Sequence, residues 1–214
     1  MKVKILHYNA GEAEAASGRS IENQRNDRRA GLDPKIKGRA QYDLRMVCRL
    51  RLRQMLADIG IGPRSSVIFL DEATDYLLAM MLRNSAVWTE RANEVAIAPP
   101  DSGGAFGPLR LAMAAAPKAL GLDGPASHPE VIEQLSKDLA AGGMSMGLLY
   151  MPATGEFRFS RRWTRELGEM IPGDPALHGP VITLAFWGVS RGLAMRLPRP
   201  ILDLIPDEDD APED

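Results

Sequence analysis

The first indication of the fold comes from residues 40–59, AQYDLRMVCRLRLRQMLADI. Large apolar side chains recur there at spacings of three and four residues, which places them on one side of a helix. They are Leu44, Cys48, Leu52, Met55 and Ile59. Gly60, Gly62 and Pro63 follow, and residues of these types end helices. The sequence therefore predicts a helix over residues 40–59.

Apolar runs on both sides of this helix predict further elements. Alternating or continuous apolar residues predict strands near residues 2–8, 66–70, 146–150, 156–160 and 181–187. Helical spacing and capping residues predict helices over residues 72–91, 109–120, 129–140 and 161–170. Strands mixed with helices in this order indicate an α/β or α+β fold, in which a mixed sheet packs against helices.

The chain of 214 residues is long enough to bury a sizeable core, and residues 1–206 are expected to form a single compact domain. Between Gly11 and Asp33 there are almost no large apolar residues. Residues 11–39 are therefore expected to form a basic, poorly packed segment, here called the basic arm. Residues 207–214 are expected to form an acidic, disordered tail.

Composition also bears on location and partners. No apolar run reaches the roughly 18 residues that a membrane span needs, and the apolar stretch at the N-terminus is short for a signal peptide. The single cysteine, Cys48, agrees with a reducing compartment. We expect a cytoplasmic protein with no membrane partner. The run from Tyr76 to Leu82 is apolar all round a helix and needs cover on every side, which predicts a homo-oligomer or a protein complex.

The net charge of −2 conceals a strong local excess of positive charge. From Arg19 to Arg64 there are twelve basic residues and five acidic ones. The basic arm contains six candidate phosphate-binding residues: Arg25, Arg28, Arg29, Lys35, Lys37 and Arg39. Three more recur at every fourth residue of the predicted helix and are here called the arginine stripe: Arg45, Arg49 and Arg53. Such a surface can follow a nucleic-acid backbone, although the same charges can equally pair with acids of this chain.

A second basic cluster lies in FRFSRRW, residues 157–163. Its candidate nucleic-acid-binding residues are Arg158, Arg161, Arg162 and Trp163. Aromatic rings beside guanidinium groups can stack on bases and contact phosphates. Alternatively, Phe157, Phe159 and Trp163 belong to the core and the arginines face water.

Signals for catalysis are weaker. GVSRG at residues 188–192 follows an apolar strand, where a hydrolase would place a nucleophile such as Ser190. In α/β-hydrolases, however, the histidine follows the serine, and all three histidines of this chain precede Ser190. A pair of glycines at a strand-to-turn junction explains the motif equally well. No histidines or cysteines lie at metal-ligand spacing, so we assign no catalytic residue, metal or cofactor.

The leading hypothesis is a nucleic-acid-binding accessory protein without catalytic chemistry, whose partner is DNA or RNA. One alternative is a structural or assembly protein whose basic arm binds neighbouring subunits. The other is a serine hydrolase-like enzyme that acts through Ser190.

Overall fold

The computed structural model describes residues 2–33, 39–97, 119–120, 147–152, 154–160, 179 and 181–205. The elements follow in the order β1 (Lys2–Ile5), α1 (Ala10–Ser17), α2 (Ile21–Arg29), α3 (Leu44–Asp58), α4 (Pro63–Met81), the 3-10 helix η1 (Ser85–Val87), α5 (Glu90–Ile97), β2 (Gly147–Met151), β3 (Glu156–Ser160), β4 (Ile182–Ala185), α9 (Phe186–Ala194) and β5 (Leu202–Ile205). Helices and small antiparallel sheets together make a mixed α+β fold, which confirms the predicted class.

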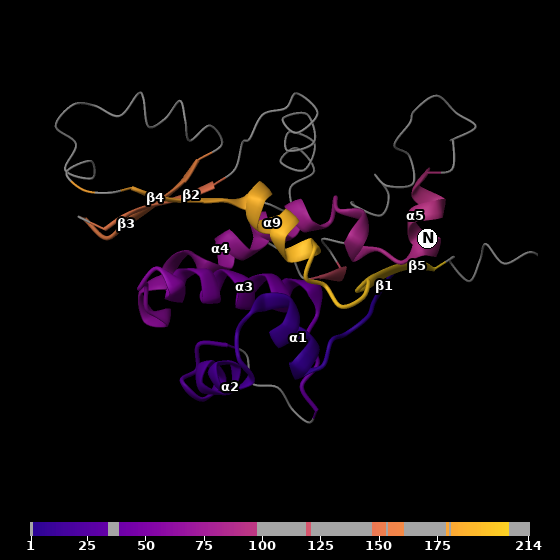
Figure 1. Ribbon diagram of the computed structural model, residues 1–214, viewed down its shortest axis with the longest axis horizontal. Coiled ribbons are helices and arrows are strands. Elements are labelled where there is room, and N and C mark those ends of the chain that lie inside the picture. Colours follow the sequence, from indigo (N-terminus) through magenta and orange to yellow (C-terminus); the bar gives the residue numbers. More distant parts are fainter. Residues whose placement is uncertain are drawn as a thin grey trace, which may run out of the picture.

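Helices α3 and α4 form the centre of the molecule, with α1 packed on α3 and α9 packed on α4 (Figure 1). The predicted helix over residues 40–59 is confirmed, and it begins at Leu44 because the Asp43 side chain accepts a hydrogen bond from the Met46 N–H at 2.8 Å. Side chains from both helices are fully buried in the core: Leu44, Val47, Cys48, Leu52, Leu70, Leu77, Leu78 and Met81.

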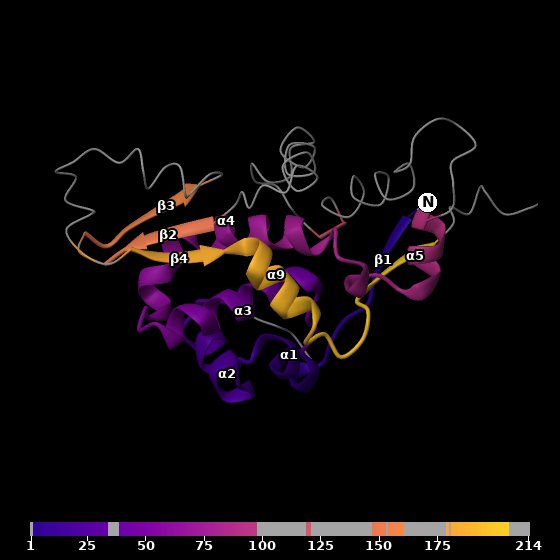
Figure 2. The same ribbon diagram turned by 45° about the horizontal axis from the view of Figure 1, so that its top comes forward.

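The strands form two separate antiparallel sheets. The three-stranded sheet has the order β3-β2-β4 and lies on the side of α4 away from α1 and α2 (Figures 1 and 2). The strands predicted near residues 146–150 and 156–160 are confirmed as β2 and β3, which pair as a hairpin through a turn in which Gly155 has a φ of 72°. The two-stranded sheet pairs β1 with β5 and thus joins the first and last described elements of the chain.

The prediction of a strand over residues 66–70 is wrong, because these residues lie in the first half of α4. Pro63 occupies the first helical turn, where the missing N–H of proline has no intrahelical partner to lose. Ser66, Phe69 and Leu70 are buried, whereas Val67 and Ile68 are exposed. Burial therefore follows the helical period through a run of apolar residues that shows no period in the sequence.

The predicted helix over residues 72–91 differs from the structure at both ends. The observed helix, α4, begins earlier, at Pro63, and ends at Met81. Asn84 then accepts a hydrogen bond from the Ala86 N–H at 3.0 Å and begins η1, and α5 starts only at Glu90. A polar cap within an otherwise helical stretch thus starts a new element.

The predicted strand over residues 181–187 is confirmed only as far as Ala185. Helix α9 starts at Phe186 and buries Phe186, Val189 and Leu193 at helical spacing. Strand β5 was not predicted, because the prolines before and after its four residues indicate an irregular segment in the sequence. Several predictions fall outside the described residues. They are the helices over residues 129–140 and 161–170, residues 109–118 of the helix over 109–120, and the acidic tail.

The described part of the basic arm differs from the expected poorly packed segment. Residues 10–17 and 21–29 form helices α1 and α2, both with side-chain caps at their N-termini. Short side chains such as Ala13, Ala16 and Ser17 are buried against the core, so this segment packs without large apolar residues.

The Tyr76 to Leu82 run is also buried throughout, so the described fold itself supplies the cover that this run needs.

Candidate nucleic-acid interface

Helices α1 and α2 are joined by a tight turn of three residues, Gly18, Arg19 and Ser20. Gly18 ends α1 with a φ of 78°, a left-handed conformation that glycine adopts without strain, and its N–H donates to the Glu14 carbonyl at 2.8 Å. The Ser20 hydroxyl then accepts from the Asn23 N–H at 3.2 Å and begins α2. Two short helices joined by a three-residue turn that contains glycine have the type of connection found in helix-turn-helix motifs.

Helix α3 supports this arrangement from behind. Helix α1 packs against α3, and after α2 the chain returns so that Tyr8 and Tyr42 pair through two backbone hydrogen bonds of 2.9 Å. Burial raises the pKa of Tyr8 to about 12. In both ribbon views α2 lies at the edge of the molecule away from the three-stranded sheet (Figures 1 and 2). The second helix of the arrangement is therefore available at the surface.

The inner side of α2 is buried and polar. Gln24 is 0% exposed and Asp27 is 3% exposed. The Arg19 guanidinium donates to both oxygens of Asp27, at 2.6 and 2.9 Å, and the Gln24 amide donates to the Arg19 carbonyl at 2.8 Å. The Arg28 guanidinium donates to the Tyr42 hydroxyl at 2.5 Å and lies over the ring. Hydrogen bonds to the turn and to Tyr42 thus hold the inner side of α2.

The opposite side of α2 is exposed and entirely polar. We call it the outer face of α2, and it consists of Glu22, Asn23, Arg25, Asn26 and Arg29. It presents guanidinium and amide groups to solvent, together with one carboxylate. Two of the predicted nucleic-acid-binding residues, Arg25 and Arg29, belong to it, and Arg28 lies beside it, half-buried.

The arginine stripe lies elsewhere, on α3, and its charges are matched by carboxylates. Arg45 pairs with Asp75 at 2.9 Å. Arg49 pairs with Asp33 at 2.9 Å and also contacts Asp71. Arg53 is 2% exposed and pairs with Asp33 at 3.3 Å. Burial lowers the pKa of the Arg53 guanidinium, and Asp33 partly offsets this effect.

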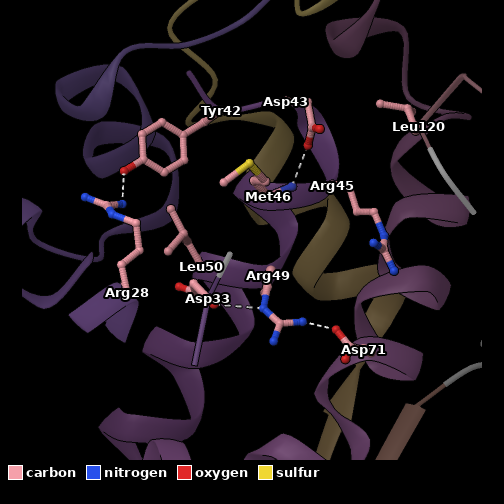
Figure 3. Close-up of a pocket in the computed structure, with 10 residues that line it drawn as sticks. All are labelled: Arg28, Asp33, Tyr42, Asp43, Arg45, Met46, Arg49, Leu50, Asp71 and Leu120. Carbon is pink, nitrogen blue, oxygen red and sulfur yellow. Dashed lines mark hydrogen bonds and ion pairs between the residues drawn. The ribbon is translucent and has the colours of Figure 1, made fainter. Parts of the chain in front are cut away.

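A cavity of about 350 Å³ opens between α2, α3 and α4 beside these pairs (Figure 3). Its lining includes Arg28 and Tyr42 on one side and Arg49 with Asp33 and Asp71 on the other. Guanidinium groups and carboxylates alternate around it, so the cavity has no single sign of charge. The arginines that line it contact acids or hydroxyl groups of this chain.

The remaining predicted site residues are dispersed. Arg39 is exposed and borders a shallow hollow with His7 and Asn9 at the start of α1. Arg158 on β3 pairs with Glu156 at 2.9 Å, with both side chains about half exposed. Lys35, Lys37, Arg161, Arg162 and Trp163 lie outside the described residues.

The aromatic residues of the hairpin contact the helices. Phe157 stacks on Phe69 of α4 with ring centroids 3.7 Å apart, and Phe159 lies 5.4 Å from Tyr76. Both rings pack against the hydrophobic core. This arrangement corresponds to the core alternative that the sequence left open for Phe157 and Phe159.

The GVSRG motif, which suggested a hydrolase, lies within a helix. Ser190 is buried inside α9, and its hydroxyl donates to the Trp187 carbonyl at 2.9 Å, so it does not project from a turn at the end of a strand. Within the described ranges no helix is long and apolar enough to cross a membrane, and no group of three or more histidine, cysteine or acidic side chains is placed to hold a metal ion.

Comparison with known proteins adds no further information, because no family model, curated protein or solved structure matches the chain.

Proposed function

We propose that this protein binds double-stranded DNA by placing α2 in the major groove. The observation that carries the proposal is the helix-turn-helix type of connection between α1 and α2, the second of which turns an entirely polar face to solvent. DNA-binding proteins with this arrangement place the second helix in the major groove.

The dimensions of the groove favour duplex DNA over duplex RNA. The major groove of B-form DNA is about 12 Å wide and admits a helix with its side chains. In A-form RNA the major groove is deep and narrow, and side chains cannot read it. A short, exposed helix such as α2 is therefore suited to DNA, which sharpens the sequence hypothesis of DNA or RNA.

The chemistry of the outer face of α2 also suits base edges. Arginine donates two hydrogen bonds to guanine in the major groove, and asparagine donates to and accepts from adenine. Arg25 and Arg29 supply the first kind of group, and Asn23 and Asn26 supply the second. The proposed interface thus includes groups for both purines.

Phosphate contacts would come from basic residues that follow α2 in the sequence. Arg39 is exposed, and Lys35 and Lys37 precede it in the sequence. Guanidinium and ammonium groups that neutralise phosphates release counterions and make affinity depend on salt. The arginine stripe is left out of this interface, because carboxylates of the chain already match its charges.

The test compares duplex DNA with duplex RNA of the same sequence, by fluorescence anisotropy over a series of salt concentrations. We expect tighter binding to DNA and an affinity that falls with salt, with a logarithmic slope of about −2 to −5 for a few phosphate contacts. No binding to duplex DNA at low salt would contradict the proposal. Tighter binding to RNA than to DNA would contradict the placement of α2 in a DNA groove.

A further inference from the structure

Helix α2 is held to the protein in an unusual way for a surface helix. Its sequence is IENQRNDRR, and Ile21 is its only apolar residue. Surface helices are ordinarily held by an apolar stripe that faces the core. Hydrophobic packing therefore contributes little to the orientation of α2, and polar contacts must provide it.

One of those polar contacts is the hydrogen bond from Arg28 to the Tyr42 hydroxyl, and others come from the turn that precedes the helix. Arg19 is 6% exposed and forms two hydrogen bonds to the Asp27 carboxylate, through Nε at 2.6 Å and Nη2 at 2.9 Å. A paired fork of this kind constrains direction as well as distance. The Gln24 amide donates to the Arg19 carbonyl at 2.8 Å, so a second contact from the same residue reaches α2 about one helical turn earlier.

The two contacts constrain how α2 is rotated about its own axis. Gln24 and Asp27 lie on the buried side, and Asn26 lies next to Asp27 in the sequence but on the exposed side. Successive residues of a helix are about 100° apart, since one turn takes 3.6 residues. A modest rotation would therefore move Asn26 and Arg29 away from one set of base edges and towards another.

The energetics of the Arg19–Asp27 pair also favour a role in orientation. A buried ion pair loses much of its attraction to the cost of removing both charges from water, and an apolar pair of similar volume often stabilises a fold equally well. Arg19 and Asp27 are thus poorly explained by stability alone. A contact that is directional in geometry and small in net stability is suited to setting an orientation.

We propose that Arg19 and Asp27 are positioning residues that set the rotation of α2 and thereby the base preference of the protein, an inference that rests on the proposed DNA binding. Neither residue contacts the bases. They act through Asn23, Arg25, Asn26 and Arg29, which they direct toward one register of the groove.

The test uses the full chain and the double variant Arg19→Met/Asp27→Leu, which replaces the ion pair with apolar side chains. A pool of random DNA duplexes is first used to select the preferred sequence of the wild type. The ratio of affinity for that sequence to affinity for random duplex is then measured for both proteins, together with the salt slope and the circular dichroism melting curve. The matched control is Glu156→Leu/Arg158→Met, which removes an exposed ion pair on β3.

We expect the Arg19 and Asp27 variant to stay folded and to keep its salt slope, while the selectivity ratio falls about tenfold or the preferred sequence changes. The control should keep both the ratio and the sequence. A folded variant with an unchanged ratio and an unchanged preferred sequence would overturn the inference but leave DNA binding intact. A wild type that binds duplex DNA without any preference would also overturn it, whereas failure to bind duplex DNA would overturn the proposed function itself.

The single variant Arg19→Lys covers the case in which the double variant does not fold. Lysine keeps the charge beside Asp27 but loses the paired geometry of the guanidinium. A drop in selectivity with an unchanged salt slope supports the positioning role. Full selectivity in a folded Arg19→Lys protein contradicts it.

Discussion

Helices α2 and α3 are both rich in arginine, yet the surroundings of their arginines differ. On α3, Arg45, Arg49 and Arg53 point to Asp33, Asp71 and Asp75, and Arg53 is almost completely buried. On α2, Arg25 and Arg29 are exposed on a face that contains a single acid, Glu22. The first set is paired with carboxylates inside the fold, and the second set is exposed to solvent. A count of basic residues along the chain cannot distinguish the two.

The largest expected effect is on α3. Replacing Arg53 with Met removes a partner of the buried Asp33 carboxylate and of the Leu32 carbonyl, to which Arg53 donates at 2.8 Å. Arg49 remains a partner of Asp33 at 2.9 Å and of the Leu32 carbonyl at 3.1 Å, so the loss is that of hydrogen bonds to a charged group, about 2 kcal/mol. We expect the free energy of unfolding, measured with urea, to fall by about this amount. The control Arg25→Met on α2 should change it by less than about 0.5 kcal/mol, and equal losses in the two variants would break the distinction between the helices.

A smaller loss of stability is expected at Arg28. This arginine is half-buried, so its surroundings are intermediate between those of the α3 arginines and those of Arg25 and Arg29. Its guanidinium donates to the Tyr42 hydroxyl at 2.5 Å and lies 5.9 Å from the ring centroid. Tyr42→Phe removes the hydroxyl and keeps the ring, so the free energy of unfolding should fall by about 1 kcal/mol. Arg28→Met removes both contacts and should cost somewhat more, by about another 0.5 kcal/mol. If neither variant is less stable than the wild type, Arg28 belongs functionally with the exposed arginines of α2.

The smallest expected effect concerns the acidic tail. Residues 207–214 contain six acids and no base, so their charge is opposite in sign to that of the arginines on the outer face of α2. Deleting these residues should strengthen binding to random DNA duplexes severalfold at low salt, and the gain should vanish near physiological salt because exposed charges are screened there. Equal affinities of the full-length and shortened proteins at low salt would show that the tail does not shield α2.

Much of the fold could be predicted from local patterns. Residues 44–58 and the β2–β3 hairpin follow spacing rules that need no knowledge of the tertiary structure. Residues 66–70 could not be assigned in this way. A short run of mostly apolar residues such as SVIFL suits a buried strand or a buried helix equally well. Pro63 at the start of the helix was the available signal for α4.

The candidate site was predicted in part. The sequence identified Arg25, Arg28 and Arg29 but not the helix that carries them, since that helix has almost no apolar residues. Its caps were visible nonetheless: glycine at position 18 suits a helix end and serine at position 20 suits a helix start. The pairing of the arginine stripe could not be foreseen, because Arg45 and Asp75 are thirty positions apart and meet only in the tertiary structure.

The proposed DNA binding depends on the outer face of α2. The most direct test compares duplex DNA binding by Arg25→Gln/Arg29→Gln with that of Arg91→Gln/Arg191→Gln, which removes the same charge from exposed positions on α5 and α9. Each lost arginine contact to a base or phosphate should weaken binding by about 1 kcal/mol or more, so the α2 variant should bind at least about tenfold more weakly than the wild type. The α5 and α9 variant should stay within about twofold, because distant exposed charges are screened. Equal weakening of the two variants would contradict this dependence on α2.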